Sequence, residues 1–342
     1  MTALVDAPTE PLLLAAAQAG DERAFRTLVE PYRRPLDVHA YRMLGSIHDA
    51  EDVVQETLMS AWRGLESFEG RASLRTWLYR IATNACLAHL RRRRPRREIP
   101  PPPEPPGAFP PGRASDDPIW LEPYPDAWIE DLPESLPGPE GRYDSREAIE
   151  LAFVVALQRL SPRERAAMVL RDVLGFRAAE TAELLETTEA SVNSALQRAR
   201  DKLDRLDREA DPPPPGSAAE RELVGRFARA FESGDIDAVV DMLAEDARLT
   251  MPPEPLEYTG AAQIRRFLST VPAAGELHRF KLVPTRANGQ PAFGCYLRTQ
   301  EGPLRAYGLM VLTLRGDQVG AITGFPDTSV FAGFGLPRIL SQ

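Results

Sequence analysis

The sequence predicts a multidomain protein with two all-α modules, a proline-rich linker between them and a C-terminal α+β domain. Three observations support this fold class. A chain of 342 residues exceeds one ordinary domain. Apolar residues recur at the helical period on both sides of a stretch, residues 95–139, that contains 15 prolines. After a second proline run, residues 212–215, the pattern changes to period two. The predicted domains are therefore residues 11–95, 96–144, 145–208 and 216–342.

The first module contains two helices that the apolar pattern marks clearly. Over residues 50–68, one stripe is formed by Val54, Leu58, Ala61 and Leu65, with Asp49 as the expected N-cap. A second helix starts at Ser73. It ends in four consecutive arginines, residues 91–94, and Pro95 terminates it. Basic residues at a helix C-terminus interact favourably with the helix dipole.

The linker carries nearly all of the net charge. The chain has 41 basic and 50 acidic residues, a formal charge of −9. Residues 100–147 hold eleven acids against three arginines, which accounts for −8. The remainder is close to neutral with local basic clusters, so the acidic average does not exclude a nucleic-acid partner. Residues 119–129 are unusual for a tether, because two of the four tryptophans, Trp120 and Trp128, lie there with Tyr124.

The second module has the spacing of a helix-turn-helix. A short helix over residues 177–185 precedes the turn Glu186-Thr187-Thr188, and a longer helix follows over residues 189–203. Five apolar residues of the longer helix share one face, which we expect to be buried. The opposite face carries short polar side chains and an amide suited to base edges, and arginines suited to phosphates. An ordinary helical hairpin with a solvated outer face is the alternative.

The C-terminal part begins with two predicted helices, residues 218–232 and 236–243. Period-two segments then follow, separated by turn signals such as Asn288-Gly289 and Gly316-Asp317. The expected strands cover residues 280–283, 292–298, 304–314 and 319–323. This pattern is typical of an α+β domain with a curved antiparallel sheet.

Cysteine content and hydropathy indicate the compartment. Only Cys86 and Cys295 are present, in segments of different character, so neither a disulfide framework nor a cysteine zinc site is expected. No stretch approaches the roughly 20 apolar residues of a membrane span. We expect a cytoplasmic protein with no membrane association, no metal and no cofactor.

Three segments, in order along the chain, resemble the sigma-70 family of bacterial transcription initiation factors, specifically its extracytoplasmic-function branch. Residues 49–58 (DAEDVVQETL) resemble the polymerase-binding helix of region 2. Residues 68–84 (FEGRASLRTWLYRIATN) resemble the part of region 2 that melts and reads the −10 promoter element. Residues 160–165 (LSPRER), followed by the helix-turn-helix, resemble region 4, which reads the −35 element.

The resemblance implies partners and site residues. Core RNA polymerase would be bound through the clamp helices of its largest subunit and through its flap, and promoter DNA would be the second partner. The implied polymerase-binding residues are Asp52, Gln55 and Glu56. The implied −10 residues are Glu69, Arg71, Ser73, Arg75, Trp77, Arg80 and Asn84. The implied −35 residues are Ala190, Ser191, Asn193, Ser194, Gln197, Arg198 and Arg200. For Trp77, a place in the core is an equal alternative.

The sequence departs from the family pattern in three places. Glu186 occupies the turn position where glycine is usual, and Thr181 replaces a larger aliphatic residue. The linker is also longer than in the smallest members. Its acids either imitate nucleic acid in the polymerase channels or cover the basic DNA-binding helices before polymerase is bound.

The C-terminal part resembles the SnoaL-like cone-shaped fold of ketosteroid isomerases and polyketide cyclases. The likeness rests on element order and on residues 231–235 (FESGD) with Asp246. It implies a regulatory domain that acts in cis, with a small-molecule ligand as a further expectation. The candidate pocket residues are Tyr258, His278, Tyr307 and Asp327, and none is predicted to be catalytic because a fold does not confer activity.

Two other functions compete with a sigma factor. One is a one-component, ligand-sensing helix-turn-helix regulator, which would leave residues 11–95 unexplained. The other is a SnoaL-like isomerase or cyclase with a DNA-binding appendage. The −10-reading segment separates the sigma factor from both.

Overall fold

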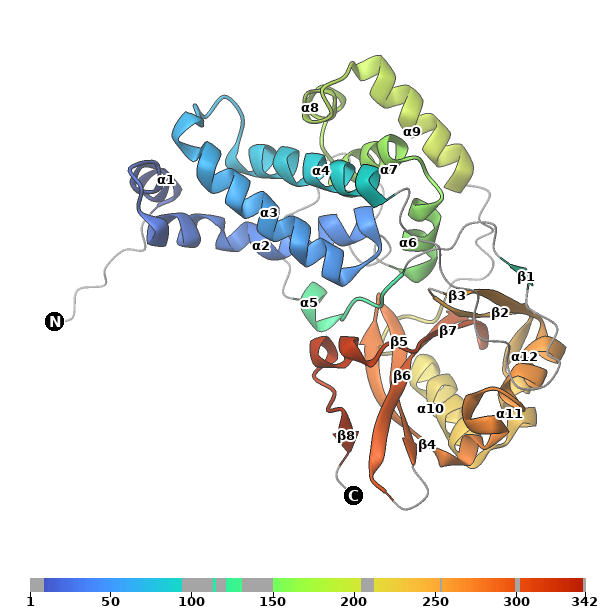
Figure 1. Ribbon diagram of the computed structural model, residues 1–342. Helices are drawn as coiled ribbons and strands as arrows, with labels where there is room; N and C mark the ends of the chain where they lie inside the picture. Colours follow the sequence, from blue (N-terminus) through green and yellow to red (C-terminus); the bar gives the residue numbers. More distant parts are fainter. Residues whose placement is uncertain are drawn as a thin grey trace. The chain divides into compact units, whose positions relative to one another are not determined.

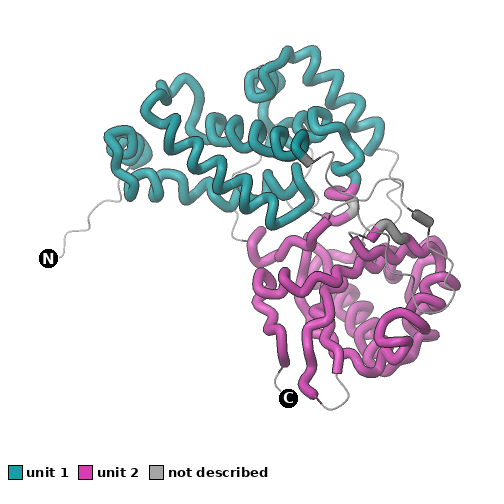
Figure 2. Tube along the Cα trace, viewed as in Figure 1, with its two compact units in different colours: residues 1–97, 132–148, 156–204 teal, residues 98–131, 149–155, 205–342 magenta. Residues whose placement is uncertain are grey.

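The structure is a computed structural model that describes residues 9–93, 113–114, 121–130, 150–203, 212–252, 254–298 and 302–340. The chain folds into two compact units (Figure 2). Unit 1 comprises residues 1–97, 132–148 and 156–204, and unit 2 comprises residues 98–131, 149–155 and 205–342. All the residues of the predicted linker that the structure describes, 113–114 and 121–130, therefore fall in the same unit as the C-terminal part.

The first half of unit 1 is helical (Figure 1). Its elements are α1 (Glu10–Gln18), α2 (Glu22–Leu44), α3 (Ile47–Gly64), the 3-10 turn η1 (Leu65–Ser67) and α4 (Leu74–Arg93). The predicted N-cap of α3 is wrong. Ser46 caps this helix, and its hydroxyl accepts a hydrogen bond from the Asp49 backbone N–H at 3.2 Å. Gly45 ends α2 in the left-handed region, with φ 74°, so the next helix starts two residues later and takes Asp49 into its first turn.

The second half of unit 1 contains the helix-turn-helix. Its elements are α7 (Pro162–Met168), a π-helical turn η3 (Val169–Val173), α8 (Ala178–Leu184) and α9 (Glu189–Leu203), and α6 (Leu151–Gln158) precedes them. Burial of one α9 face is confirmed for Val192, Ala195, Leu196, Ala199 and Leu203. Glu186 adopts a left-handed conformation with φ 50°, which explains why glycine is favoured there. The turn therefore keeps its geometry, and Glu186 bears the backbone strain of a positive φ.

Unit 2 is built on one sheet in the order β1-β3-β2-β7-β6-β5-β4. The strands are β1 (Arg113–Ala114), β2 (Leu243–Met251), β3 (Glu254–Thr259), β4 (Phe280–Ala287), β5 (Gln290–Arg298), β6 (Leu304–Arg315) and β7 (Gln318–Phe325), with β8 (Ile339–Leu340) paired to β6. The four strands from β4 to β7 form an antiparallel meander, and β2 pairs with β7 in parallel. At the β4–β5 turn, Asn288 and Gly289 have φ 57° and 72°, as the predicted two-residue hairpin requires.

Three helices cover one face of this curved sheet (Figure 1). They are α10 (Ala218–Ser233), α11 (Ile236–Asp241) and α12 (Ala261–Leu268). Leu223 and Phe227 of α10 pack with Phe293 and Leu312 of the sheet in the main core. The short turns η4 (Pro272–Gly275) and η5 (Leu277–Arg279) precede β4, and η6 (Thr328–Phe334) covers the other face through Phe331 and Tyr296.

The linker contributes structure that its proline content does not predict. Arg113 and Ala114 form β1, which pairs antiparallel with β3. Residues 127–130 form the short helix α5 (Ala127–Glu130). Ile119 and Trp120 lie outside the described residues, as do most of the linker acids.

Candidate nucleic-acid interface and linker-docking site

The candidate base-reading face of α9 is open to solvent. Ala190, Ser191, Asn193, Ser194, Gln197 and Arg198 are all exposed, opposite the buried face of the same helix. Gln197 Nε2 donates to Asp201 Oδ1 at 2.8 Å, one helical turn away. The face therefore presents small polar side chains and amides, the groups that recognise base edges in a major groove.

Basic side chains of α9 are anchored to α7. Arg198 Nε and Lys202 Nζ donate to the Glu164 carboxylate at 3.0 and 2.8 Å, and the Ser161 backbone N–H donates at 3.0 Å. Burial alone would raise the pKa of Glu164. The hydrogen bonds from Lys202, Ser161 and Arg198 outweigh burial and lower that pKa to about 2. Arg198 nevertheless keeps 59% of its side-chain surface exposed, so it can also reach a phosphate.

Arg200 has a different environment from Arg198. Its Nε and Nη2 bind both oxygens of Asp172 at 2.8 and 2.6 Å. The Asp172 side chain is only 2% exposed and lies on the π-helical turn η3. A bidentate pair of this kind fixes α9 against η3, which gives Arg200 a structural task in addition to the predicted phosphate contact.

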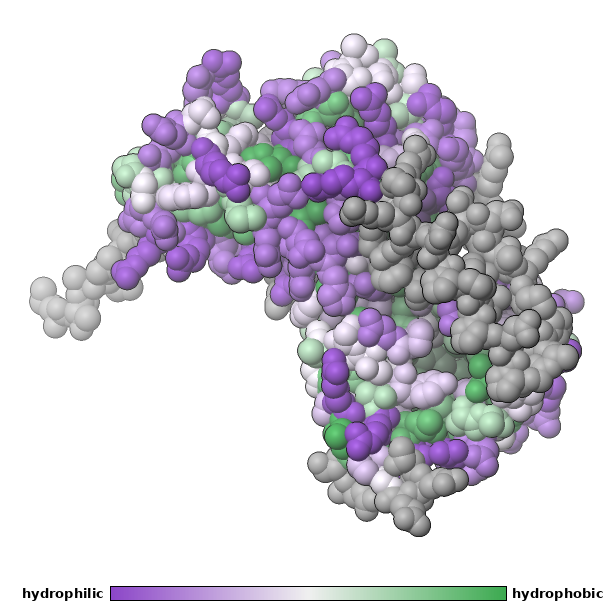
Figure 3. Space-filling model, in the orientation of Figure 1, coloured by the Kyte–Doolittle hydropathy of each residue, from purple (hydrophilic) through white to green (hydrophobic). Residues whose placement is uncertain are grey.

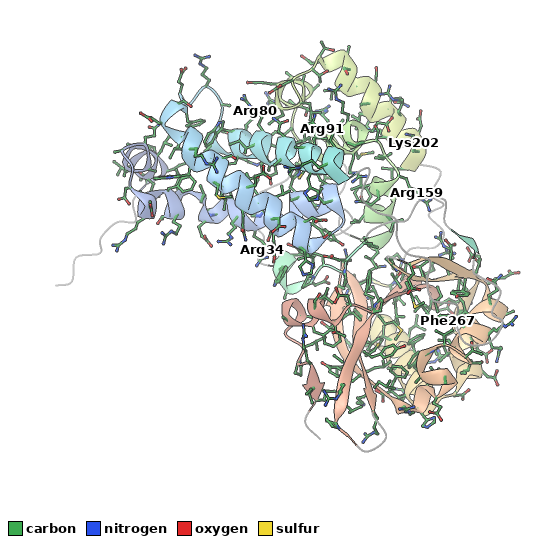
Figure 4. All side chains as sticks on the ribbon, viewed as in Figure 1. Arg34, Arg80, Arg91, Arg159, Lys202 and Phe267 are labelled. Carbon is green, nitrogen blue, oxygen red and sulfur yellow. The ribbon has the colours of Figure 1, made fainter. Side chains whose placement is uncertain are left out.

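The predicted −10 segment presents a polar, partly basic surface. Glu69, Arg71, Ser73, Arg80 and Asn84 are exposed. Arg71 pairs with Glu69 at 2.5 Å. Arg80 and Arg91 lie along the same helix, α4 (Figure 4). Hydrophilic residues dominate the face of unit 1 that Figure 3 shows.

Trp77 is half-buried, and its ring lies 4.8 Å from that of Phe68. It serves the packing of this segment and keeps part of its surface accessible. Tyr79 is different, because it is fully buried. Its ring therefore offers no accessible surface to unpaired bases.

Arg75 does not share the exposed face of α4. Its guanidinium carbon lies 4.5 Å from the Phe176 ring centroid and 5.3 Å from that of Tyr79. Its Nη2 donates to the Leu174 carbonyl at 3.4 Å. The structure therefore places Arg75 against the segment that enters the helix-turn-helix, rather than beside Arg80 and Asn84.

The predicted polymerase-binding residues share one exposed face of α3. Asp52, Gln55 and Glu56 are all accessible. Glu56 lies 3.6 Å from Arg92 of α4, and both side chains keep about half or more of their surface exposed. An exposed pair of this kind contributes little to stability, so the acidic face stays available to a partner.

Unit 2 binds part of the linker along β4, the strand at one edge of its sheet. Pro125 pairs with Ala287 in an antiparallel bridge at the β4–β5 hairpin. The Tyr124 N–H donates to Asn288 Oδ1 at 2.7 Å, and the Asn288 N–H donates to the Tyr124 carbonyl at 2.8 Å. The docked linker segment, residues 121–130, is thus held by backbone geometry as well as by side chains.

An ion-pair network reinforces this linker docking. Arg286 donates to Asp126 Oδ2 at 3.2 Å, to Glu220 Oε1 at 2.7 Å and to the Gly289 carbonyl at 2.8 Å. The second oxygen of Asp126 accepts the Gly289 N–H at 2.8 Å. Sequence reasoning did not identify this cluster. The only available signal was an aspartate within the aromatic island and a hairpin turn about 160 residues away.

The aromatic residues of the docked linker segment are sheltered. Tyr124 is 1% exposed, and its ring meets that of Trp128 edge-on at 5.6 Å. Trp128 lies so close to Gly333 of η6 that a methyl group there would come within 3.2 Å of the indole. Burial of Tyr124 and partial burial of Trp128 reduce the apolar surface that these two residues would otherwise expose.

The four candidate pocket residues have separate local environments. Tyr258 is buried against Phe267, with ring centroids 5.0 Å apart. Tyr307 packs edge-on against Phe280 at 4.9 Å and is 42% exposed. His278 is exposed, and Asp327 caps η6 by accepting the Ser329 N–H at 2.8 Å. Phe267, Phe280 and Ser329 are thus contact partners of Tyr258, Tyr307 and Asp327, respectively.

Comparison with known families supports each module. Residues 28–96 match Sigma-70 region 2, residues 150–203 match Sigma-70 region 4, and residues 224–319 match the SnoaL-like domain. Within the described ranges, no helix is both long and apolar enough to cross a membrane.

Relatives are found among curated proteins and solved structures. The ECF RNA polymerase sigma factor SigG of Mycobacterium tuberculosis is 43% identical over 332 residues, which cover 94% of this chain and 87% of SigG. SigJ of the same species is 32% identical over 65% of this chain and 62% of its own. The crystal structure of SigJ superposes with a TM-score of 0.60 at 25% identity, covering 91% of this chain and 99% of SigJ.

Proposed function

We propose the following function for this chain, which belongs to the extracytoplasmic-function sigma factors of RNA polymerase: it binds the core enzyme, reads two promoter elements and is regulated in cis by its own C-terminal domain. The observation that carries the proposal is the division of α9 into a buried apolar face and an exposed polar face within a helix-turn-helix.

Reading of the −35 element is proposed for the exposed face of α9. Asn193, Ser194 and Gln197 would meet base edges, and Arg198 would meet phosphate. Ala190 and Ser191, at the start of the helix, would lie close to the groove and limit which bases fit. Arg200 would act mainly by holding α9 in place, because Asp172 occupies its guanidinium.

Reading of the −10 element is proposed for the exposed face of α4 and the preceding loop. Arg80 and Asn84 lie one turn apart and are exposed. Glu69, Arg71 and Ser73 precede the helix, where a loop can accept an unstacked base. Trp77 would support this loop through Phe68.

Core polymerase is proposed to bind the acidic face of α3, formed by Asp52, Gln55 and Glu56, through the clamp helices of its largest subunit. Region 4 would bind the flap. The exposure of all three α3 side chains supports the first contact.

The C-terminal domain is proposed to regulate the sigma factor without catalysis. Its support is the docked linker segment, in which Asp126 and Tyr124 are held by the β4–β5 hairpin. The separate environments of Tyr258, His278, Tyr307 and Asp327 favour this role over an isomerase or cyclase. A small-molecule ligand in this domain stays a prediction.

Selection of promoter sequences from a random library tests the proposal. Core polymerase reconstituted with this chain should enrich two different elements at a fixed spacing. The free chain without polymerase is the control. Enrichment of one palindromic element by the free chain would instead indicate a one-component regulator, because a dimeric helix-turn-helix reads two equivalent half-sites.

A further inference from the structure

The helix α4 has two faces with different surroundings. Successive residues of an α-helix turn by about 100°, so positions 75 and 84 lie on opposite sides of the helix. Asn84 is exposed, with Arg80 on the same side. Arg75 lies on the side of Tyr79 and Cys86, both of which are fully buried. The face that carries Arg75 is thus distinct from the face proposed to meet DNA.

This second face of α4 binds region 4 within unit 1. The Arg75 guanidinium lies against the rings of Tyr79 and Phe176 and donates to the Leu174 carbonyl. The two rings also meet edge-on, with centroids 5.5 Å apart. Phe176 is 2% exposed. Arg75 is thus a partly buried cation held by two aromatic rings and a carbonyl, a contact that cation–π attraction strengthens.

A second contact joins the same two modules. Arg165 of α7 donates from Nη1 to the Met43 carbonyl at the end of α2. The same guanidinium also donates to Gln158 Oε1 at 2.7 Å and to the Gln158 carbonyl at 3.0 Å. Arg165 is 4% exposed, so this connection between regions 2 and 4 is buried.

These contacts are incompatible with reading two promoter elements at once. Elements centred about 25 base pairs apart are separated by ~85 Å at about 3.4 Å per base pair. Helix α4 has 20 residues and α9 has 15. At about 1.5 Å per residue they would span only ~52 Å even if placed end to end. Regions 2 and 4 must therefore separate before both elements can be bound.

From these observations we infer that Arg75 is a latch that holds regions 2 and 4 in a closed form, and that it does not read the −10 element. The inference rests on the proposed promoter-reading function. Loss of the latch exposes Phe176 and Tyr79 and frees the two modules to spread along DNA. Core polymerase would then bind the open form in preference to the closed form.

Single-molecule energy transfer tests the latch directly. Donor and acceptor dyes are attached to Ser67→Cys and Glu183→Cys, two exposed positions in regions 2 and 4, while both native cysteines are buried. Arg75→Gln in the full chain should raise the population of the open, low-transfer form about tenfold. Affinity for core polymerase should rise by the same factor, because only the open form is competent to bind.

The controls use the same helix and the partner ring. Arg80→Gln, on the opposite face, should leave energy transfer unchanged and weaken binding of a −10 oligonucleotide. Arg75→Lys keeps the charge and should open the protein less than Arg75→Gln does. Phe176→Leu removes the ring while retaining apolar volume, and it should also open the protein. This variant tests the same contact should Arg75→Gln fail to fold.

Each outcome has a definite meaning. Wild-type energy transfer in folded Arg75→Gln and Phe176→Leu proteins would overturn the latch. Opening by both variants would support the latch. If the wild-type chain nevertheless failed to direct promoter binding by polymerase, the proposed function would be refuted and the latch would stand.

Discussion

At the scale of single residues, two arginines on the same helix differ in their exposure and in their binding partners. Arg198 and Arg200 both lie on α9, and the sequence predicts a phosphate contact for both. Arg198 is mostly exposed, whereas Arg200 is bound by the buried carboxylate of Asp172. Sequence spacing identified the exposed face of α9, but it could not identify the internal partner of Arg200, because Asp172 lies 28 residues away on a different element.

Gln197→Ala should relax selectivity at one or two −35 positions. A lost base contact costs about 1–3 kcal/mol for the preferred base, whereas a lost phosphate contact weakens all sequences alike. Binding of polymerase holoenzyme to single-base promoter variants measures the difference. Uniform weakening across all variants would show that Gln197 does not face the bases.

Arg200→Ala should destabilise region 4. Removing one partner of a buried ion pair leaves the Asp172 charge uncompensated, which costs about 3 kcal/mol of unfolding free energy. Arg198→Ala is the matched control, because its pair with Glu164 is exposed on the arginine side and should change stability by less than about 1 kcal/mol. Equal midpoints for both variants in urea unfolding would contradict the structural task assigned to Arg200.

At the scale of elements, α3 carries the exposed acidic face that is proposed to bind core polymerase. Replacing Asp52 and Glu56 together with arginine should abolish core polymerase binding, since it reverses the charge of an exposed face. The fold should persist because neither side chain is buried. Pull-down of core polymerase and circular dichroism measure the two properties. Unchanged polymerase affinity in the folded variant would show that this face does not dock.

Elements with a strong local period were predictable from the sequence, and elements that depend on distant partners were not. The bounds of α9 agree with the prediction, because an apolar stripe and a turn define them. Strands β2 and β3 and helix α12 were missed. Prolines at 252, 253 and 255 interrupt the period-two pattern between the two strands and within β3. The bridge between Pro125 and Ala287 could not be predicted from local sequence, because its two residues are far apart along the chain.

At the scale of the whole molecule, the docked linker segment belongs to the unit of the C-terminal domain. Truncation after Asp211 removes the hairpin that binds Tyr124 and Asp126. Promoter-dependent transcription should then change several-fold, and Trp128 should become accessible to a fluorescence quencher. The docked segment would lose both its backbone pairing and its aromatic shelter. Transcription and quenching equal to those of the full chain would exclude regulation in cis.

Promoter-specific initiation by this chain can be measured in a run-off transcription assay with purified core polymerase. Core enzyme plus this chain should produce a defined transcript from a template selected by the holoenzyme. A template with a scrambled −35 element, and the Asp52→Arg/Glu56→Arg variant on the intact template, should give none. Absence of a transcript from the wild-type chain, or equal transcription from the scrambled template, would contradict the account.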